Sequence, residues 1–125
     1  MKNKKILITG ATGLLGSWLT EKLLILGNEI TGLALNDELD FLLMSKKIKD
    51  EINLKYFDIA IEESTNNLFD NNYDVVIHLA AQTQVGDALS NPIRTFKSNI
   101  QGTWNVLEIC RKKDIPLVVA SSDKA

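Results

Sequence analysis

Short runs of β-branched and apolar residues alternate along the chain with longer stretches in which apolar residues recur at helical spacing. This alternation is typical of βαβ units, in which each strand is followed by a helix that leads back to the same sheet. The runs predict five strands, which lie at residues 5–9, 29–35, 54–57, 74–79 and 117–121. The run at 74–79 is apolar on both faces, as a central parallel strand must be.

The first helix predicted between these strands begins near Leu14 and ends before Gly27, a residue suited to the turn that follows a helix. Weaker patterns predict helices over 37–50 and 62–71. The apolar positions that recur at helical spacing in the first helix are Leu14, Leu15, Trp18, Leu19, Leu23 and Leu26.

A longer helix is predicted from Pro92 onward, because Asn91 is a good N-cap and proline is favoured at the first helical position. The apolar face predicted for this helix runs through Ile93, Phe96, Ile100, Trp104, Leu107 and Cys110.

Five strands with helical crossovers favour an α/β fold with a Rossmann-like, doubly wound parallel sheet in the order 3-2-1-4-5. The fifth strand would then be an exposed parallel edge, whereas parallel sheets are normally covered on both faces. We therefore expect residues 1–125 to form one incomplete domain of something larger.

Three glycines follow the first predicted strand and open the first helix. Gly10, Gly13 and Gly16 match the pattern T-G-x-x-G-x-x-G, a wider relative of the dinucleotide-binding fingerprint. The first glycine permits the tight turn, the second a close approach to a pyrophosphate, and the third close packing of helix on strand. The helix N-terminus supplies free N–H groups to the anion. The residues that this motif assigns to a dinucleotide are Gly10, Thr12, Gly13, Leu14, Leu15 and Gly16.

The second strand of such a fold usually ends in an acidic residue that binds the adenosine ribose. That position is Ala34 here, and Asn36 and Asp37 follow it directly. These two residues either replace the missing carboxylate or merely cap the next helix. Since no Arg or Lys lies between Gly32 and Asp40 to receive a 2′-phosphate, the sequence favours NAD over NADP.

Composition narrows the possible functions. The 125 residues are 45% hydrophobic and 24% charged, with a net charge of −2, which is ordinary for a globular domain. A charge so near neutral predicts no nucleic-acid or membrane partner. One cysteine and one histidine predict neither a disulfide framework nor a metal site. The lack of a long apolar run or a signal-peptide cleavage pattern predicts a cytoplasmic protein.

The motifs together resemble the extended short-chain dehydrogenase/reductase family of NAD-dependent epimerases and dehydratases. The resemblance rests on the glycine motif, Asp58-Ile59, His78 to Ala81 and Asn99. More narrowly, the stretch His78 to Gln82 together with Ser121 to Ala125 resembles nucleotide-sugar 4,6-dehydratases, above all the CDP-glucose branch. The resemblance covers the whole chain but only the N-terminal part of that family.

The resemblance implies further contacts with NAD. It assigns Asp58 to the adenine amino group, although an acidic residue after a strand is also a common turn residue. It makes Asn99 a structural residue close to the cofactor, the alternative being a solvent-facing asparagine. His78, inside an apolar strand, is interpreted as a core or supporting residue rather than a catalyst. The other positions assigned to the cofactor site are Ile59, Leu79, Ala80, Ala81 and Gln82.

The end of the fifth strand carries the catalytic residues that the resemblance implies. Ser122 matches the hydroxyl that binds the sugar C4 oxygen, and Asp123 matches the acid that protonates the leaving C6 hydroxyl. Lys124 matches a position near the base that removes the sugar C5 proton. In 4-epimerases the positions of Asp123 and Lys124 carry small uncharged residues, so the acid at position 123 favours an enzyme that eliminates water. Without the resemblance, these residues would be interpreted as a solvated turn.

The implied reaction converts a nucleoside-diphosphate hexose into its 4-keto-6-deoxy form, and the implied assembly is a homodimer. The family also uses a Tyr-x-x-x-Lys pair, but Ala60 and Ile77 stand four residues after Tyr56 and Tyr73. We therefore expect residues 1–125 to bind a dinucleotide without turnover. Two other functions stay open: another enzyme of the extended family, such as a 4-epimerase or a reductase, and a dinucleotide-binding module without chemistry.

Overall fold

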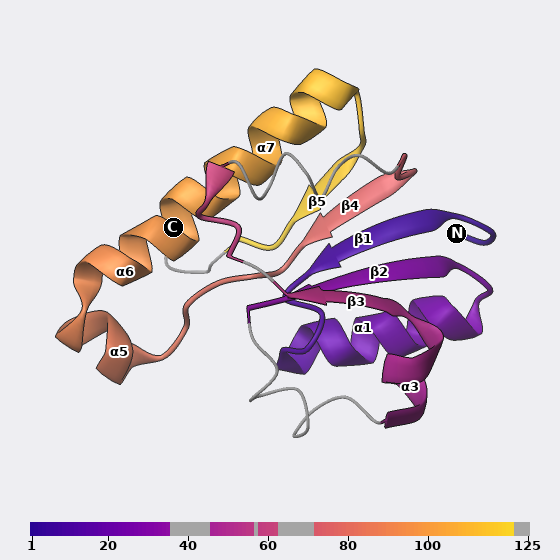
Figure 1. The fold of residues 1–125 in the computed structure, drawn as a ribbon, viewed down its shortest axis with the longest axis horizontal. Coiled ribbons are helices and arrows are strands. Elements are labelled where there is room, and N and C mark those ends of the chain that lie inside the picture. Colours follow the sequence, from indigo (N-terminus) through magenta and orange to yellow (C-terminus); the bar gives the residue numbers. More distant parts are fainter. Residues whose placement is uncertain (36–45, 57, 63–71, 122–125) are drawn as a thin grey trace.

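A single parallel sheet organises the chain in the computed structural model (Figure 1), which describes residues 1–35, 46–56, 58–62 and 72–121. The strand order is β3-β2-β1-β4-β5, and every neighbouring pair is parallel. This topology confirms the predicted order 3-2-1-4-5. The strands are β1 (Lys5–Thr9), β2 (Glu29–Ala34), β3 (Asn53–Tyr56), β4 (Val75–His78) and β5 (Leu117–Val119).

The two faces of the sheet are covered by different helices. Helices α1 (Leu14–Ile25) and α3 (Lys46–Glu51) lie on one face, and α7 (Gly102–Lys113) lies on the other (Figure 1). Because successive side chains of a strand point to opposite faces, Ile6 and Ile8 pack with the α1 layer while Leu7 packs with the α7 layer. This alternation places two separate cores on one sheet.

Helix α1 buries only part of its predicted apolar face. In the first half of α1 the side chains that face inward are small or polar, and Trp18 is 69% exposed, whereas Leu23 near the end of the helix is buried. The cause is the close approach of the Gly16 backbone to Gly10, which leaves no room at the start of the helix for leucine or tryptophan on the inside. The apolar spacing therefore predicted the helix correctly but indicated its buried face only at Leu23 and, in part, at Leu19. The buried residues of α1 are Gly16, Ser17, Thr20 and Leu23.

The region after β4 holds more helices than the sequence predicted. A short helix, α5 (Val85–Ser90), precedes the predicted one and was not expected. Asn91 then caps α6 (Pro92–Phe96), and its side chain accepts a hydrogen bond of 3.2 Å from the Arg94 N–H, as the cap prediction required. The helix continues into a π-helical turn, η1 (Lys97–Gln101), before α7.

The sheet-facing side of α7 is also shifted from the predicted apolar face. The residues of α7 that are buried are Gly102, Val106, Ile109 and Cys110. Of the predicted face, only Cys110 is buried, and Trp104 is 64% exposed. Gly102 determines which side of α7 faces inward, because a Cβ atom there would lie 2.8 Å from Cγ1 of Ile59. The side of α7 that carries this glycine therefore packs against Ile59 and the core around it.

Two weaker predictions are tested only in part. The helix expected over 37–50 overlaps α3, and the rest of that range lies outside the described residues. The helix expected over 62–71 lies outside them except for residue 62.

Candidate functional site

A hollow of about 220 Å³ opens where the carboxyl ends of the central strands meet. Ligands of doubly wound sheets bind at this edge, next to the point where the strand order reverses. In this chain that point lies between β1 and β4, which are neighbours in the sheet but distant in sequence. The hollow is lined by Gly10, Thr12, Gly13, Leu33, Ala34, Leu35, Asp58, Ile59, Leu79, Ala80, Ala81, Gln82 and Ser98.

Gly10 makes the turn between β1 and the glycine loop. Its φ of +70° is a backbone conformation that residues other than glycine rarely adopt. A Cβ atom on Gly10 would also lie 2.8 Å from the backbone nitrogen of Ala80. The loop therefore passes directly beside the end of β4, and no residue larger than glycine fits between them.

The N-terminus of α1 is open toward an anion. Gly13 is its N-cap and makes no side-chain capping bond, and the first turn contains no acidic residue. The first N–H groups of a helix lack partners within the helix and, with the helix dipole, attract negative charge. A diphosphate is the kind of group that such an end binds.

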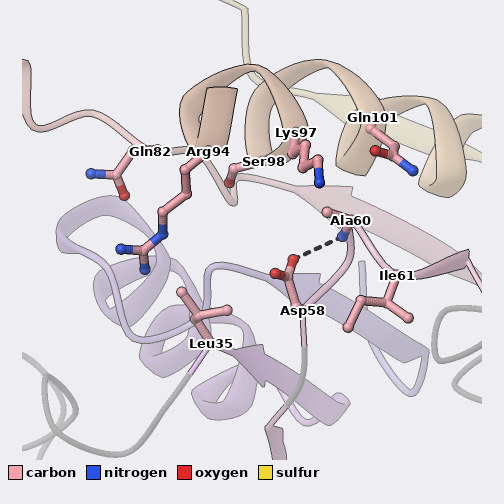
Figure 2. A pocket seen from close by; sticks show the side chains of 9 residues that line it. All are labelled: Leu35, Asp58, Ala60, Ile61, Gln82, Arg94, Lys97, Ser98 and Gln101. Atoms are coloured by element: carbon pink, nitrogen blue, oxygen red, sulfur yellow. Dashed lines mark hydrogen bonds between the residues drawn. The ribbon is translucent and has the colours of Figure 1, made fainter. Parts of the chain in front are cut away.

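A second hollow, of about 270 Å³, adjoins the first along Asp58 and Gln82. Figure 2 shows Asp58 with its carboxylate toward Ala60, whose N–H donates a hydrogen bond of 2.8 Å to Oδ1. Arg94 and Lys97 extend into this hollow from the helices above it (Figure 2). This part of the site therefore combines one carboxylate with two cations.

Asn99 and Gln82 hold the segment after β4 against the helix that follows it. The Gln82 N–H donates to Oδ1 of Asn99 at 2.7 Å, and Nδ2 of Asn99 donates back to the Gln82 carbonyl at 3.0 Å. The side chain of Gln82 donates from Nε2 to Asp87 at 2.9 Å. Asn99 is thus a half-buried structural clamp rather than a solvent-facing residue.

His78 lies behind the hollow at the end of β4. It is 3% exposed, and its ring lies between the hydroxyl groups of Thr9 and Thr103. Burial lowers the pKa of this imidazole, because the charged form loses its hydration. His78 does not line either hollow, in agreement with its interpretation as a supporting residue.

The sequence from residue 6 to residue 125 matches the model of the NAD dependent epimerase/dehydratase family. The chain belongs to this family.

Several relatives within the NAD-dependent epimerase/dehydratase family are similar over most of the chain. An uncharacterised protein of Methanocaldococcus jannaschii is 32% identical over 100% of this chain and 41% of its own length. The CDP-glucose 4,6-dehydratase of Salmonella typhimurium is 30% identical over 89% of this chain and 32% of its own length. The chain therefore spans well under half the length of these relatives.

A solved structure from the same family has the same fold. The UDP-glucose 4-epimerase of Thermotoga maritima, determined with UDP-glucose, superposes with a TM-score of 0.82 at 26% identity. The match covers 94% of this chain and 38% of that one.

Most of the residues that the sequence assigned to the cofactor site meet at the first hollow. Nine of them line it, namely Gly10, Thr12, Gly13, Asp58, Ile59, Leu79, Ala80, Ala81 and Gln82. Asn99 lies behind it as the clamp on Gln82, and Gly16 packs under the loop. The side chains of Leu14 and Leu15 are exposed, and Leu15 lines a separate hollow on the outer side of α1. The side chain of Leu15 therefore lies away from the cleft.

Some predicted residues are not described and some lining residues were not predicted. Asn36, Asp37, Ser122, Asp123 and Lys124 lie outside the described residues. The sequence analysis did not assign Leu33, Leu35, Ser98, Arg94 or Lys97 to the site. The first two could have been inferred from their position at the end of β2, but the last three depend on how the helices after β4 are oriented.

No helix within the described ranges is long and apolar enough to cross a membrane.

Proposed function

We propose that the chain is the NAD-binding part of a nucleotide-sugar 4,6-dehydratase of the CDP-glucose type. The observation that carries the NAD part is the meeting of the glycine loop, the uncapped α1 N-terminus and Asp58 around one hollow. Such a hollow offers N–H groups to a diphosphate and a carboxylate to an adenine amino group.

Each part of the hollow has its own role in binding NAD. Gly10 and Gly13 let the backbone approach the diphosphate, and the α1 N-terminus binds its charge. Asp58 accepts from the adenine amino group, and its orientation is maintained by the Ala60 N–H. Asn99 keeps Gln82 at the mouth of the cleft, where its side chain reaches the cofactor ribose or the sugar.

The dehydratase assignment rests on the three residues after the fifth strand. Bound NAD would supply the hydride acceptor that oxidises the sugar at C4 and later returns the hydride to C6. Ser122 orients the C4 oxygen, and Asp123 protonates the leaving hydroxyl at C6. Lys124 assists removal of the C5 proton, which the neighbouring ketone makes acidic. Positioned acids and bases of this kind typically contribute about 10²–10⁴-fold each.

Titration calorimetry with NAD and NADP tests the cofactor proposal. We expect NAD to bind more tightly, because no Arg or Lys lies between Gly32 and Asp40 next to the adenosine ribose. Equal or tighter binding of NADP contradicts this preference, and no binding of either dinucleotide contradicts the proposed function.

A nucleotide-sugar 4-epimerase is the second candidate, supported by the similarity to the Thermotoga maritima UDP-glucose 4-epimerase. The full-length enzyme with Asp123→Ala separates the two. A dehydratase loses elimination but still transfers hydride from C4, whereas an epimerase keeps its activity. Glu29→Ala is a suitable control, because this exposed acidic residue begins β2, at the opposite end of that strand from the hollows, and lines neither of them.

The proposed full-length enzyme is a cytoplasmic homodimer. The apolar residues Trp104 and Leu107 support a subunit contact, since both are exposed on the outer side of α7. Sedimentation of the full-length enzyme with Trp104→Glu should show a shift toward monomer. A dimer of unchanged affinity would contradict this interface.

A further inference from the structure

The ring of His78 is the centre of a buried chain of hydrogen bonds that crosses from the sheet to the helix layer. Nδ1 lies 2.6 Å from the hydroxyl oxygen of Thr9, and Nε2 lies 3.0 Å from the hydroxyl oxygen of Thr103. Thr9 is fully buried on β1, and Thr103 is half-buried on α7. One imidazole thus connects the sheet to the α7 layer.

The neighbouring bonds determine which ring nitrogen carries the proton. The Thr103 hydroxyl donates to the carbonyl of Asn99 at 2.7 Å, so its oxygen accepts from His78 and Nε2 carries the hydrogen. The Thr9 hydroxyl oxygen accepts the N–H group of Ala80 at 3.2 Å and shares the Leu79 N–H, 3.2 Å away, with the Thr9 carbonyl at 3.1 Å. Its own hydrogen then points to Nδ1, which accepts it.

The opposite tautomer does not satisfy the same groups. With the proton on Nδ1, the Thr9 oxygen would receive three N–H groups and its own hydrogen would lose its acceptor. Nε2 would then face the Thr103 oxygen while the Thr103 hydrogen is held by Asn99. The Nε2 nitrogen and the Thr103 hydroxyl oxygen would meet without a proton between them, which is costly inside a protein.

The chain of bonds ends at two parts of the cleft. Thr9 leads directly into Gly10, the first residue of the glycine loop. Thr103 lies one turn after Asn99, whose side chain holds the backbone of Gln82. The imidazole therefore connects the loop on one side of the hollow to the helix that holds the other side.

We propose that His78 is a positioning residue of the dinucleotide cleft. Held neutral with its proton on Nε2, it links Thr9 to Thr103 and sets the spacing between the glycine loop and the Gln82 segment. This inference rests on the proposed function, because it assigns the effect to dinucleotide binding. His78 does not touch the ligand and acts only through these two threonines.

The tautomer can be observed directly, because His78 is the only histidine of the chain. Two-bond ¹H–¹⁵N correlation spectra of the protein distinguish a protonated ring nitrogen from an unprotonated one without any resonance assignment. We expect one neutral form, with Nε2 protonated and Nδ1 free, near pH 7. A spectrum of the Nδ1-protonated form, or of an imidazolium, overturns the proposal before any substitution is made.

Thr103 offers a matched pair of substitutions. Thr103→Val keeps the shape but removes the hydroxyl group, and Thr103→Ser keeps the hydroxyl group. We expect Thr103→Val to shift the ring away from the pure Nε2-protonated form and to weaken NAD binding roughly tenfold, the scale of one lost buried hydrogen bond. Thr103→Ser should restore both the tautomer and the affinity to within about twofold. If the Val and Ser variants bind NAD equally, the proposal fails.

Val106→Ala separates positioning from general loss of stability. Val106 is fully buried one turn further along α7 and does not line the hollow. Its truncation should lower the thermal midpoint while leaving the His78 spectrum and the NAD affinity unchanged. If the parent protein binds no NAD, the proposed function fails, and the spectra of the parent and Thr103→Val still decide whether the imidazole links the two threonines.

Discussion

Gly16 lies against the backbone of Gly10, so that a Cβ atom on Gly16 would come within 2.8 Å of the Gly10 carbonyl carbon. The third glycine of the loop therefore sets the distance between α1 and the turn that begins the loop. Because this contact is backbone to backbone, neither partner has a flexible side chain that could move aside. The contact also explains why the sheet-facing side of α1 carries only small residues near its start.

Gly16→Ala is expected to displace the start of α1 and to weaken NAD binding at least tenfold. The added methyl group overlaps the Gly10 carbonyl, and separating the two moves the α1 N-terminus away from the diphosphate. Overpacking of this kind costs about 1–3 kcal/mol of stability. Calorimetric titration and thermal unfolding measure the two effects.

Gly86→Ala is the control, because nothing lies within 4 Å of a Cβ atom at Gly86. Gly86 lies in α5, where alanine is favoured over glycine by up to about 1 kcal/mol. We expect unchanged NAD affinity and equal or higher stability. If both alanine variants bind NAD like the parent, the role assigned to Gly16 is wrong.

Asn99→Ala should loosen the segment that carries Gln82. The substitution removes both hydrogen bonds to the Gln82 backbone and leaves its N–H and carbonyl to find other partners. Leaving such groups unpaired costs about 1–3 kcal/mol. We expect weaker NAD binding by titration and faster amide exchange at Gln82.

Asn91→Ala is matched to this substitution, because Asn91 also uses its side chain to accept from backbone, at the start of α6. Loss of this N-cap should cost about 0.5–2 kcal/mol of stability but leave the Gln82 amide unchanged. An equal effect of both substitutions on Gln82 would contradict a local clamp.

Much of the fold follows from local pattern, but the orientation of the helices does not. The apolar runs predicted the strands within one or two residues, because β-branched residues between turns leave few alternatives. The faces of α1 and α7 were partly mispredicted because the close contacts are made by Gly16, against Gly10 after β1, and by Gly102, against Ile59 after β3. Apolar spacing reports only which side of a helix is hydrophobic. At these two helices the inward side is determined by which residues are small enough for a close backbone contact.

The site was predictable where one motif carries it and not where the fold assembles it. Gly10 was identified because its glycine motif follows a strand that ends at the binding edge, and Asp58 because the family resemblance assigns its position after the third strand to the cofactor. Arg94 and Lys97 reach the same edge only because the chain after β4 forms α5 and turns back. No spacing rule along the sequence connects these cations to β2.

The stability of the protein should fall as the pH decreases below about 6.5, and His78 is the cause. Burial lowers the pKa of His78 in the folded state from its ordinary 6.5, so the unfolded chain takes up a proton first. Above that pH, His78 is neutral in both states and the free energy of unfolding does not depend on it. As the pH falls toward the folded pKa, the free energy of unfolding decreases by up to about 1.4 kcal/mol per pH unit. Denaturant titrations at constant ionic strength measure it.

His78→Phe provides the control for this pH dependence. The variant is expected to be less stable at every pH, but its stability should stay flat from neutral pH to about pH 5. Glu108 titrates well below this window, since its hydrogen bond from Arg111 lowers its pKa to about 2. A variant that keeps the slope of the parent would assign the effect to another group.

The thiol of Cys110 should be unreactive in the folded protein. It is 3% exposed on the sheet-facing side of α7, and burial raises its pKa to about 11. Since the thiolate is the reactive form, an alkylating reagent at about pH 8 should label the native protein slowly and the denatured protein quickly. Mass spectrometry counts the single label, and rapid labelling of the native protein would contradict the burial of this residue.

The two cations above the second hollow should contribute to dinucleotide affinity through charge. Arg94 and Lys97 extend into this hollow beside Asp58, and within the described residues neither forms an ion pair (Figure 2). A dinucleotide in the adjoining hollow brings a diphosphate to the same edge, so both cations attract it across solvent. Exposed charges of this kind contribute about 0.2–1 kcal/mol each.

The double variant Arg94→Gln, Lys97→Gln should therefore bind NAD several-fold more weakly at about 0.05 M salt, and the difference should nearly vanish at about 0.5 M, where screening is strong. Lys22→Gln removes a cation from the outer side of α1, away from the cleft, and should change neither affinity nor salt dependence. A deficit in the double variant that persists at high salt would mean that these side chains contact the ligand directly.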